Sequence, residues 1–415
     1  MPLKFDFENS SVSYPKNFEK FDDYTNYLKE ILQKKTYDCP ESFILLPYEK
    51  QFLEQTKKIL HSIKPDLLIL IGIGGSNLGA WAVYEAVFGR YAILQNKKIL
   101  FADVPDPSLL NQILFFSSLY QKQKKKVCLV FISKSGSTLE SVANFKALYL
   151  HLKKKAKNLD ILFISNQNVF NPIELEKLNI YSLQIPQQVV GRYSVFSSVG
   201  LFPLLFSEVN AKKLLDGAKF AIENFLGRNK EDLYKTSYFI YNHYSSKKNI
   251  FINFCFSSSL DKYGQWHNQL LAESLSKNSK GLTPYYSSAP ADLHSLAQLY
   301  FGGPKDKFFS FLSIKNFKFD FKFFQNFGIF KEEDILKNKS IFSVYNSIFN
   351  GVKNSFKNSK IPFISLELDF LDEFHIGYLM QFDMLKTIFC SKLFEVNPFN
   401  QPEVELYKKE IKKLL

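Results

Sequence analysis

The sequence predicts an α/β protein with two domains of similar size, each a doubly wound parallel sheet between two layers of helices. Short apolar segments alternate with segments of helical periodicity, which is typical of strand–helix–strand units. The apolar segments are apolar at almost every position, as strands buried on both faces of a sheet require. A chain of 415 residues also exceeds the usual size of one hydrophobic core.

This alternation divides the chain into a lead-in (1–60), a first α/β domain (61–210), a second α/β domain (211–395) and a helical tail (396–415). The first domain is expected to have strands at 67–73, 98–102, 127–133 and 160–165, with helices at 77–88, 108–119 and 138–152. The second is expected to open with a helical stretch at 211–235, followed by strands at 250–256, 308–314 and 361–366 and helices at 263–275, 342–356 and 370–393. No linker rich in Pro or Gly marks the boundary, and an amphipathic helix is expected at 401–415.

Composition excludes several classes of protein. The net charge is +13, but Lys and Arg are scattered along the chain, so we expect no nucleic-acid partner. The four cysteines form no metal-binding or disulfide-type pair, and Cys128 and Cys255 lie in apolar strand-like segments. The N-terminus lacks the apolar core of a signal peptide, and no apolar run is long enough to span a membrane. We therefore expect a cytoplasmic protein without membrane attachment or a metal site.

A glycine-rich turn, Gly72–Ser76, follows the first strand and opens a helix. Glycines allow a sharp turn with free backbone N–H groups, and a helix N-terminus favours an anion. The turn lacks the spacing of a dinucleotide-binding motif. Tight strand-to-helix packing alone explains such a turn equally well.

A second turn, Ser133–Thr138, also lies between a strand and a helix, and it gathers four hydroxyl groups around one glycine. A helix cap explains one of these hydroxyls, whereas phosphate binding accounts for all of them. Ligands of open parallel sheets bind beyond the carboxyl ends of the strands, and both turns are expected at that edge. Together they predict a site for one small phosphorylated ligand.

Three further segments contain residues suited to catalysis. Arg192 precedes an apolar helix for which Ser194 is a candidate cap, and an Arg at the mouth of a site can stabilise an oxyanion, although a surface Arg is the simpler explanation. Gln269 and Glu273 are four residues apart on one helix face, where Glu273 could be a general base or an ordinary exposed acid.

His294 is the third candidate. A single histidine is more often structural than catalytic, but Asp292 lies two residues away and could orient the imidazole.

Six motifs in this order resemble those of glucose-6-phosphate isomerases. They are GIGGSNLGA (72–80), SKSGSTLE (133–140), GRYS (191–194), QLLAES (269–274), DLHS (292–295) and NPFNQPEVELYKK (397–409). Each motif is weak alone, but six in the family's order form a specific pattern that covers most of the chain.

The resemblance implies two sugar-isomerase (SIS-type) domains and interconversion of glucose 6-phosphate and fructose 6-phosphate through a cis-enediol, without a cofactor. It implies a homodimer in which His294 is donated by the neighbouring subunit. It also assigns roles to residues: phosphate binding to Ser133, Lys134, Ser135 and Thr138; the sugar side to Gly75 and Ser76; proton transfer to Glu273; charge stabilisation to Arg192; ring opening to His294 and Lys408; and sugar positioning to Gln269 and Gln401.

The chain departs from the family's pattern at Val190, Asn400 and Glu403, and the carboxylate of Glu403 could pair with Lys408. Two other functions remain open at this point. One is an SIS-type isomerase with another substrate, or one that also accepts mannose 6-phosphate. The other is a non-catalytic sugar-phosphate sensor, although the sequence leaves no room for a DNA-binding segment before Leu67.

Overall fold

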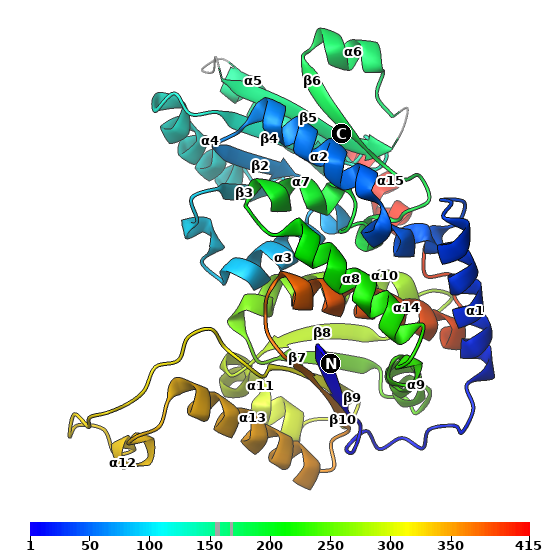
Figure 1. Ribbon diagram of the computed structural model, residues 1–415, viewed down its shortest axis with the longest axis vertical. Helices are drawn as coiled ribbons and strands as arrows, with labels where there is room; N and C mark the ends of the chain where they lie inside the picture. The colour runs from blue at the N-terminus through cyan, green and yellow to red at the C-terminus, as the bar shows by residue number, and fades with distance from the viewer. Residues whose placement is uncertain (154–157, 167–168) are drawn as a thin grey trace.

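The computed structural model describes residues 1–153, 158–166 and 169–415, and in this part of the chain there are two five-stranded sheets with helices on both faces (Figure 1). The predicted fold class is confirmed. The second sheet differs in one respect, because a strand from the lead-in joins its edge in the antiparallel direction.

The first sheet is parallel, with the order β3-β2-β4-β5-β6. Its strands are β2 (Leu67–Ile71), β3 (Lys98–Ala102), β4 (Val127–Ile132), β5 (Leu159–Asn166) and β6 (Ile180–Ile185). The helices around it are α2 (Lys50–Ile63), α3 (Leu78–Phe88), α4 (Pro107–Lys122), α5 (Leu139–Lys153), α6 (Pro172–Lys177) and α7 (Ser198–Phe206). β2 is buried at every position, which explains its apolar sequence.

The second sheet has the order β1-β10-β9-β7-β8. Its strands are β1 (Leu3–Asp6), β7 (Ile250–Cys255), β8 (Thr283–Ser288), β9 (Lys307–Ile314) and β10 (Phe363–Leu368). Its helices are α8 (Ala211–Phe225), α9 (Lys230–Ser245), α10 (Asp261–Leu275), α11 (Ala291–Gly302), α12 (Glu333–Leu336), α13 (Ile341–Asn358) and α14 (Glu373–Phe394). The helical stretch expected at 211–235 is two helices, α8 and α9.

The two domains share their largest hydrophobic cluster, which explains why no linker separates them. The largest cluster of buried apolar residues includes side chains from β2 and β4 of the first sheet and from β7 and β10 of the second. α14 lies within this cluster and packs along α8 and α9. The remaining helices are α1 (Glu19–Lys34) in the lead-in and α15 (Val404–Leu414) at the C-terminus. Figure 1 shows that α15 returns to the first domain.

One segment projects from the second domain. Residues 315–340, between β9 and α13, extend away from the body and carry α12 (Figure 1). We call this segment the aromatic arm, because it leaves four phenylalanines 70–83% exposed: Phe319, Phe321, Phe324 and Phe327.

Cys128 and Cys255 are buried as expected, and burial raises the pKa of both thiols. Among the residues that the structure describes, no helix is both long and apolar enough to cross a bilayer.

Candidate active site

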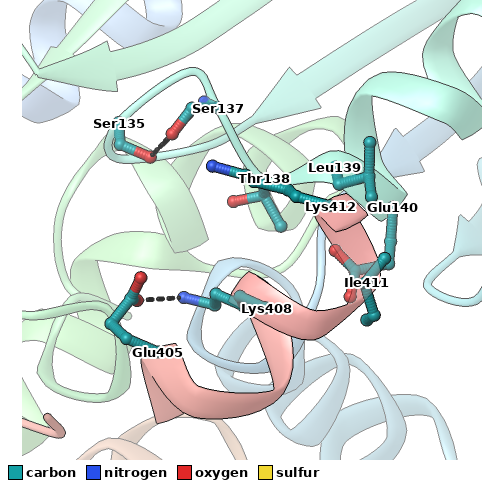
Figure 2. A pocket seen from close by; sticks show the side chains of 9 residues that line it. All are labelled: Ser135, Ser137, Thr138, Leu139, Glu140, Glu405, Lys408, Ile411 and Lys412. Atoms are coloured by element: carbon teal, nitrogen blue, oxygen red, sulfur yellow. Dashed lines mark hydrogen bonds and ion pairs between the residues drawn. The ribbon is translucent and has the colours of Figure 1, made fainter. Parts of the chain in front are cut away.

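The turn Ser133–Thr138 joins the carboxyl end of β4 to α5 and forms one wall of a pocket of about 240 Å³ (Figure 2). Gly136 has a φ of +67°, a conformation that residues with a Cβ rarely adopt. Ser135, Ser137 and Thr138 line the pocket. The hydroxyls therefore gather at the N-terminus of α5, where an anion is favoured.

Ser133 has a different position from the other residues of its turn. Its side chain is buried and does not line the pocket, and its Oγ lies 3.2 Å from Thr138 Oγ1, so the two hydroxyls share a hydrogen bond. Lys134 belongs to this turn and is half-buried. Burial, and then the nearby Arg192 charge, lower the pKa of Lys134.

The opposite wall of the pocket is α15. Lys408 and Lys412 are four residues apart, and both line the pocket, with Lys412 extending toward Thr138 (Figure 2). Lys408 Nζ donates to Glu405 Oε1 at 2.7 Å, and this bond raises the pKa of Lys408. The structure thus pairs Lys408 with Glu405, and the expectation that Glu403 takes this place is wrong.

Arg192 forms the centre of a second, buried cluster. Its side chain is 1% exposed, and all five N–H groups of its guanidinium donate to oxygens of the protein. The acceptors are Ser274 Oγ (2.9 Å), Glu273 Oε2 (2.8 Å), Gln401 Oε1 (2.9 Å) and the carbonyl oxygens of Pro398 (2.6 Å) and Asn400 (3.3 Å). Arg192 therefore connects the first domain to α10 and to the C-terminal tail.

Glu273 lies on α10 with 30% of its side chain exposed, so a ligand can reach it. Its Oε1 accepts a hydrogen bond from Gln269 Nε2 at 3.0 Å, as their spacing predicts. The amide oxygen of Gln269 is buried and has no partner among the described residues. Because an unsatisfied buried acceptor costs about 1–3 kcal/mol, this oxygen is a suitable acceptor for a ligand hydroxyl.

The glycine-rich turn packs directly against this cluster. A Cβ on Gly74 would lie 2.6 Å from Gln269 Nε2, and a Cβ on Gly75 would lie 2.3 Å from the carbonyl carbon of Gly191 and 2.4 Å from Arg192 N. The glycines are therefore required because two parts of the site approach the turn closely. Ser76 is half-buried in the same turn.

The turn that carries Arg192 is closed by Ser194, whose Oγ donates to Gly191 O at 2.7 Å. The expected capping role of Ser194 is wrong, because α7 begins at Ser198 and its cap is Ser197. The extra turn η4 (Gly191–Tyr193) precedes both serines and presents the Arg192 side chain to α10.

His294 is exposed on α11, and no described contact brings it to Glu273 within one chain. The expectation that Asp292 orients the imidazole is wrong, since its carboxylate accepts hydrogen bonds from Ser287 Oγ (3.0 Å) and Ser288 N (2.7 Å) instead.

Two residues of the site were missed by sequence reasoning. Ser274 is fully buried and lies between Arg192 Nε and the hydroxyl of Tyr193, at 2.9 and 3.0 Å. Lys412 was missed although its spacing from Lys408 places both on one helix face. That spacing was the available signal, whereas nothing in the sequence indicates the contact of Ser274.

Fold and site together define a protein with two sugar-isomerase-type α/β domains. The family model described as "Phosphoglucose isomerase" matches residues 55–305. The chain belongs to the phosphoglucose isomerase family.

Similar proteins include a probable glucose-6-phosphate isomerase of Methanococcus maripaludis, 32% identical over 94% of this chain and 88% of the relative. A glucose-6-phosphate isomerase of Mycoplasmopsis synoviae is 30% identical over 99% of this chain and 97% of the relative.

Among solved structures, a hypothetical protein from Thermus thermophilus has a TM-score of 0.84 at 26% identity, with 99% of each chain covered. A glucose-6-phosphate isomerase from Chlamydia trachomatis has a TM-score of 0.77 at 18% identity, covering 100% of this chain and 88% of that one. At 18% identity, the similarity to the Chlamydia trachomatis structure shows the fold alone.

Proposed function

We propose that this chain catalyses the reversible aldose–ketose isomerisation of glucose 6-phosphate and fructose 6-phosphate through a cis-enediol intermediate. The observation that carries the proposal is the Glu273 carboxylate, held by Arg192 at 2.8 Å and still partly open to solvent. Electrostatics connect this pair to the hydroxyl-rich turn, because burial and then the charge of Arg192 lower the pKa of Lys134. A base and an anion site of this kind are what the reaction requires.

The substrate phosphate binds at the N-terminus of α5. Ser135 and Thr138 donate hydroxyl hydrogen bonds to it, Lys134 contributes charge, and Ser133 keeps Thr138 in place. Anchoring the phosphate on the first domain fixes the sugar relative to α10, because the glycine-rich turn packs tightly against both Arg192 and Gln269.

Glu273 moves the proton between C2 and C1. In the direction from glucose 6-phosphate, its carboxylate takes the proton from C2, the C–H electron pair forms the C1–C2 double bond of the enediol, and the C1 oxygen takes up negative charge. The proton of the C2 hydroxyl passes to the C1 oxygen, and Glu273 returns its proton to C1 as the C2–O bond becomes the carbonyl of the ketose. Since all five donors of Arg192 are engaged, Arg192 stabilises this charge through its own positive charge and by holding Glu273.

The sugar is positioned by groups around this pair. Gly75 and Ser76 face it from the neighbouring turn, and the buried oxygen of Gln269 accepts a sugar hydroxyl. Gln401 is already bound to Arg192 at 2.9 Å. Lys408 assists ring opening once the substrate draws it from Glu405.

We also propose a homodimer in which His294 of one copy completes the site of the other. Two observations support it. His294 is exposed on the face of the second sheet that α11 and α13 cover, away from Glu273. The aromatic arm leads into α13 and exposes several phenyl rings, and exposed apolar surface of this kind is typical of an interface.

Complementation tests the shared site. A His294→Ala chain and a Glu273→Gln chain are each expected to be inactive, whereas a mixed dimer contains one site with both native residues. Co-refolding the two chains should therefore restore about a quarter of wild-type activity per chain, since about half of the dimers are mixed and half of their sites are intact. Recovery at background level would refute the donated histidine.

The direct test of the reaction is a coupled assay on the purified protein. Conversion of fructose 6-phosphate should be seen as NADPH formed by added glucose-6-phosphate dehydrogenase, and mannose 6-phosphate is the control substrate. Absence of NADPH from fructose 6-phosphate would refute the assignment, whereas NADPH from mannose 6-phosphate would show that this sugar is accepted as well. The reaction is a step of glycolysis and gluconeogenesis, and for that reason we propose a cytoplasmic location.

A further inference from the structure

The turn that follows α10 places a buried ammonium group beside the backbone of Glu273. Lys277 lies two residues beyond the end of the helix and is 7% exposed. Its Nζ donates to the carbonyl oxygens of Glu273 (2.6 Å) and Ser274 (2.9 Å). Carbonyls in the last turn of a helix lack intrahelical partners, and the helix dipole favours a cation there. Lys277 provides both hydrogen-bond donors for these carbonyls and a positive charge at the C-terminus of α10.

The backbone at Lys277 is itself held in a tight turn. Its N–H and carbonyl groups pair with those of Lys280 at 3.0 and 2.9 Å, and Asn278 and Ser279 between them have φ values of +54° and +59°. The side chain of Lys280 goes elsewhere, since its Nζ donates to Phe394 O at 3.1 Å near the end of α14. The two lysines of this turn therefore form a matched pair, and Lys277 alone of the two reaches Glu273.

Lys277 also belongs electrostatically to the Arg192 cluster. Burial, and then the charge of Arg192, lower its pKa to about 8, while the carboxylates of Glu403 and Glu273 oppose this shift. Arg192 comes from η4, Glu273 from α10 and Glu403 from the C-terminal tail, and these elements meet at the site.

We propose that Lys277 is a positioning residue for the isomerisation: its ammonium holds the backbone of Glu273 and so keeps the carboxylate where proton transfer needs it. The inference rests on the proposed role of Glu273 as the base. A displacement of about 1 Å can cost on the order of 100-fold in rate. Because the phosphate is anchored on α5 of the first domain, loss of Lys277 lowers kcat and leaves KM nearly unchanged.

The experiment compares Lys277→Met with Lys280→Met in steady-state kinetics on fructose 6-phosphate, with thermal unfolding followed in parallel. For Lys277→Met we expect kcat to fall roughly 10- to 100-fold with KM within about threefold of wild type. For Lys280→Met we expect both constants within about twofold. Lys277→Arg keeps the charge and the donors, and it should recover most of the lost kcat.

Two results would overturn the inference: equal kcat values for the two methionine variants, or a rise in KM without a fall in kcat. Where Lys277→Met does not fold, the pH profile of Lys277→Arg decides. Wild-type kcat should decline as the ammonium deprotonates near pH 8, and the arginine variant should keep its activity to higher pH, so coinciding profiles would contradict the proposal. A wild-type protein inactive on fructose 6-phosphate would instead refute the proposed function itself.

Discussion

Replacing Glu273 by Gln changes the proposed base without changing its shape. In the structure, one carboxylate oxygen accepts from Arg192 and the other from Gln269. The new amide oxygen can keep the bond to Arg192, but the new NH₂ group then faces the Nε2 of Gln269. Gln269 can turn its amide over, because its own oxygen is without a partner among the described residues. The fold should therefore tolerate the change.

We expect Glu273→Gln to have a small effect on stability and a large effect on kcat. Exchanging a charge-assisted hydrogen bond for a neutral one costs about 1 kcal/mol of stability. Loss of a general base costs about 10²- to 10⁴-fold in kcat, or roughly 3–5 kcal/mol in the barrier. The phosphate contacts lie on another element, so KM should stay within about threefold. The coupled assay measures both constants, and a kcat within tenfold of wild type would refute the assignment of Glu273.

Three further predictions address the rest of the site. Replacing Ser135 and Thr138 together by Ala should raise KM about 10- to 100-fold with kcat largely retained, because the loss falls on phosphate binding; an unchanged KM in the coupled assay would move the phosphate elsewhere. Lys412→Ala should raise KM several-fold at low salt, with Lys413→Ala as the control, since Lys413 pairs with Glu410 and does not line the pocket; equal effects would contradict a role in binding. Gly75→Ala should lower stability by about 1–3 kcal/mol and reduce kcat, because its Cβ would meet backbone atoms of η4 at 2.3–2.4 Å; an unchanged melting temperature would contradict this.

The interior strands and the edge strand β3 could be predicted from the sequence, whereas the other edge strands could not. The central strands are buried on both faces and stand out as apolar runs. The missed strands β6 and β8 are both edge strands, and their burial alternates or is partial. β8 even contains Pro284, which an edge strand tolerates. β1 was missed because its partner lies more than 350 residues away in the sequence.

Within the site, contacts between residues close in the sequence could be predicted, whereas contacts between residues far apart in the sequence could not. The pairing of Gln269 with Glu273 follows from helical spacing alone. The bond from Arg192 to Gln401 spans 209 residues of sequence, and no local pattern indicates it. The choice of Glu405 over Glu403 depends on where α15 begins, because the helix places Glu405 one turn before Lys408.

The bonds of Arg192 have a consequence for how the site is assembled. Arg192 comes from the first domain, Glu273 from α10 of the second and Gln401 from the tail, and the guanidinium binds all three elements at once. The backbone of Arg192 adds a contact, because its carbonyl accepts from Trp266 Nε1 on α10 at 3.2 Å. A buried charge that loses one of its partners is strongly destabilising, so each of these elements needs the others in place. The phosphate turn and the base therefore reach their catalytic arrangement when both domains and the tail have docked, and the shared core makes that docking part of folding.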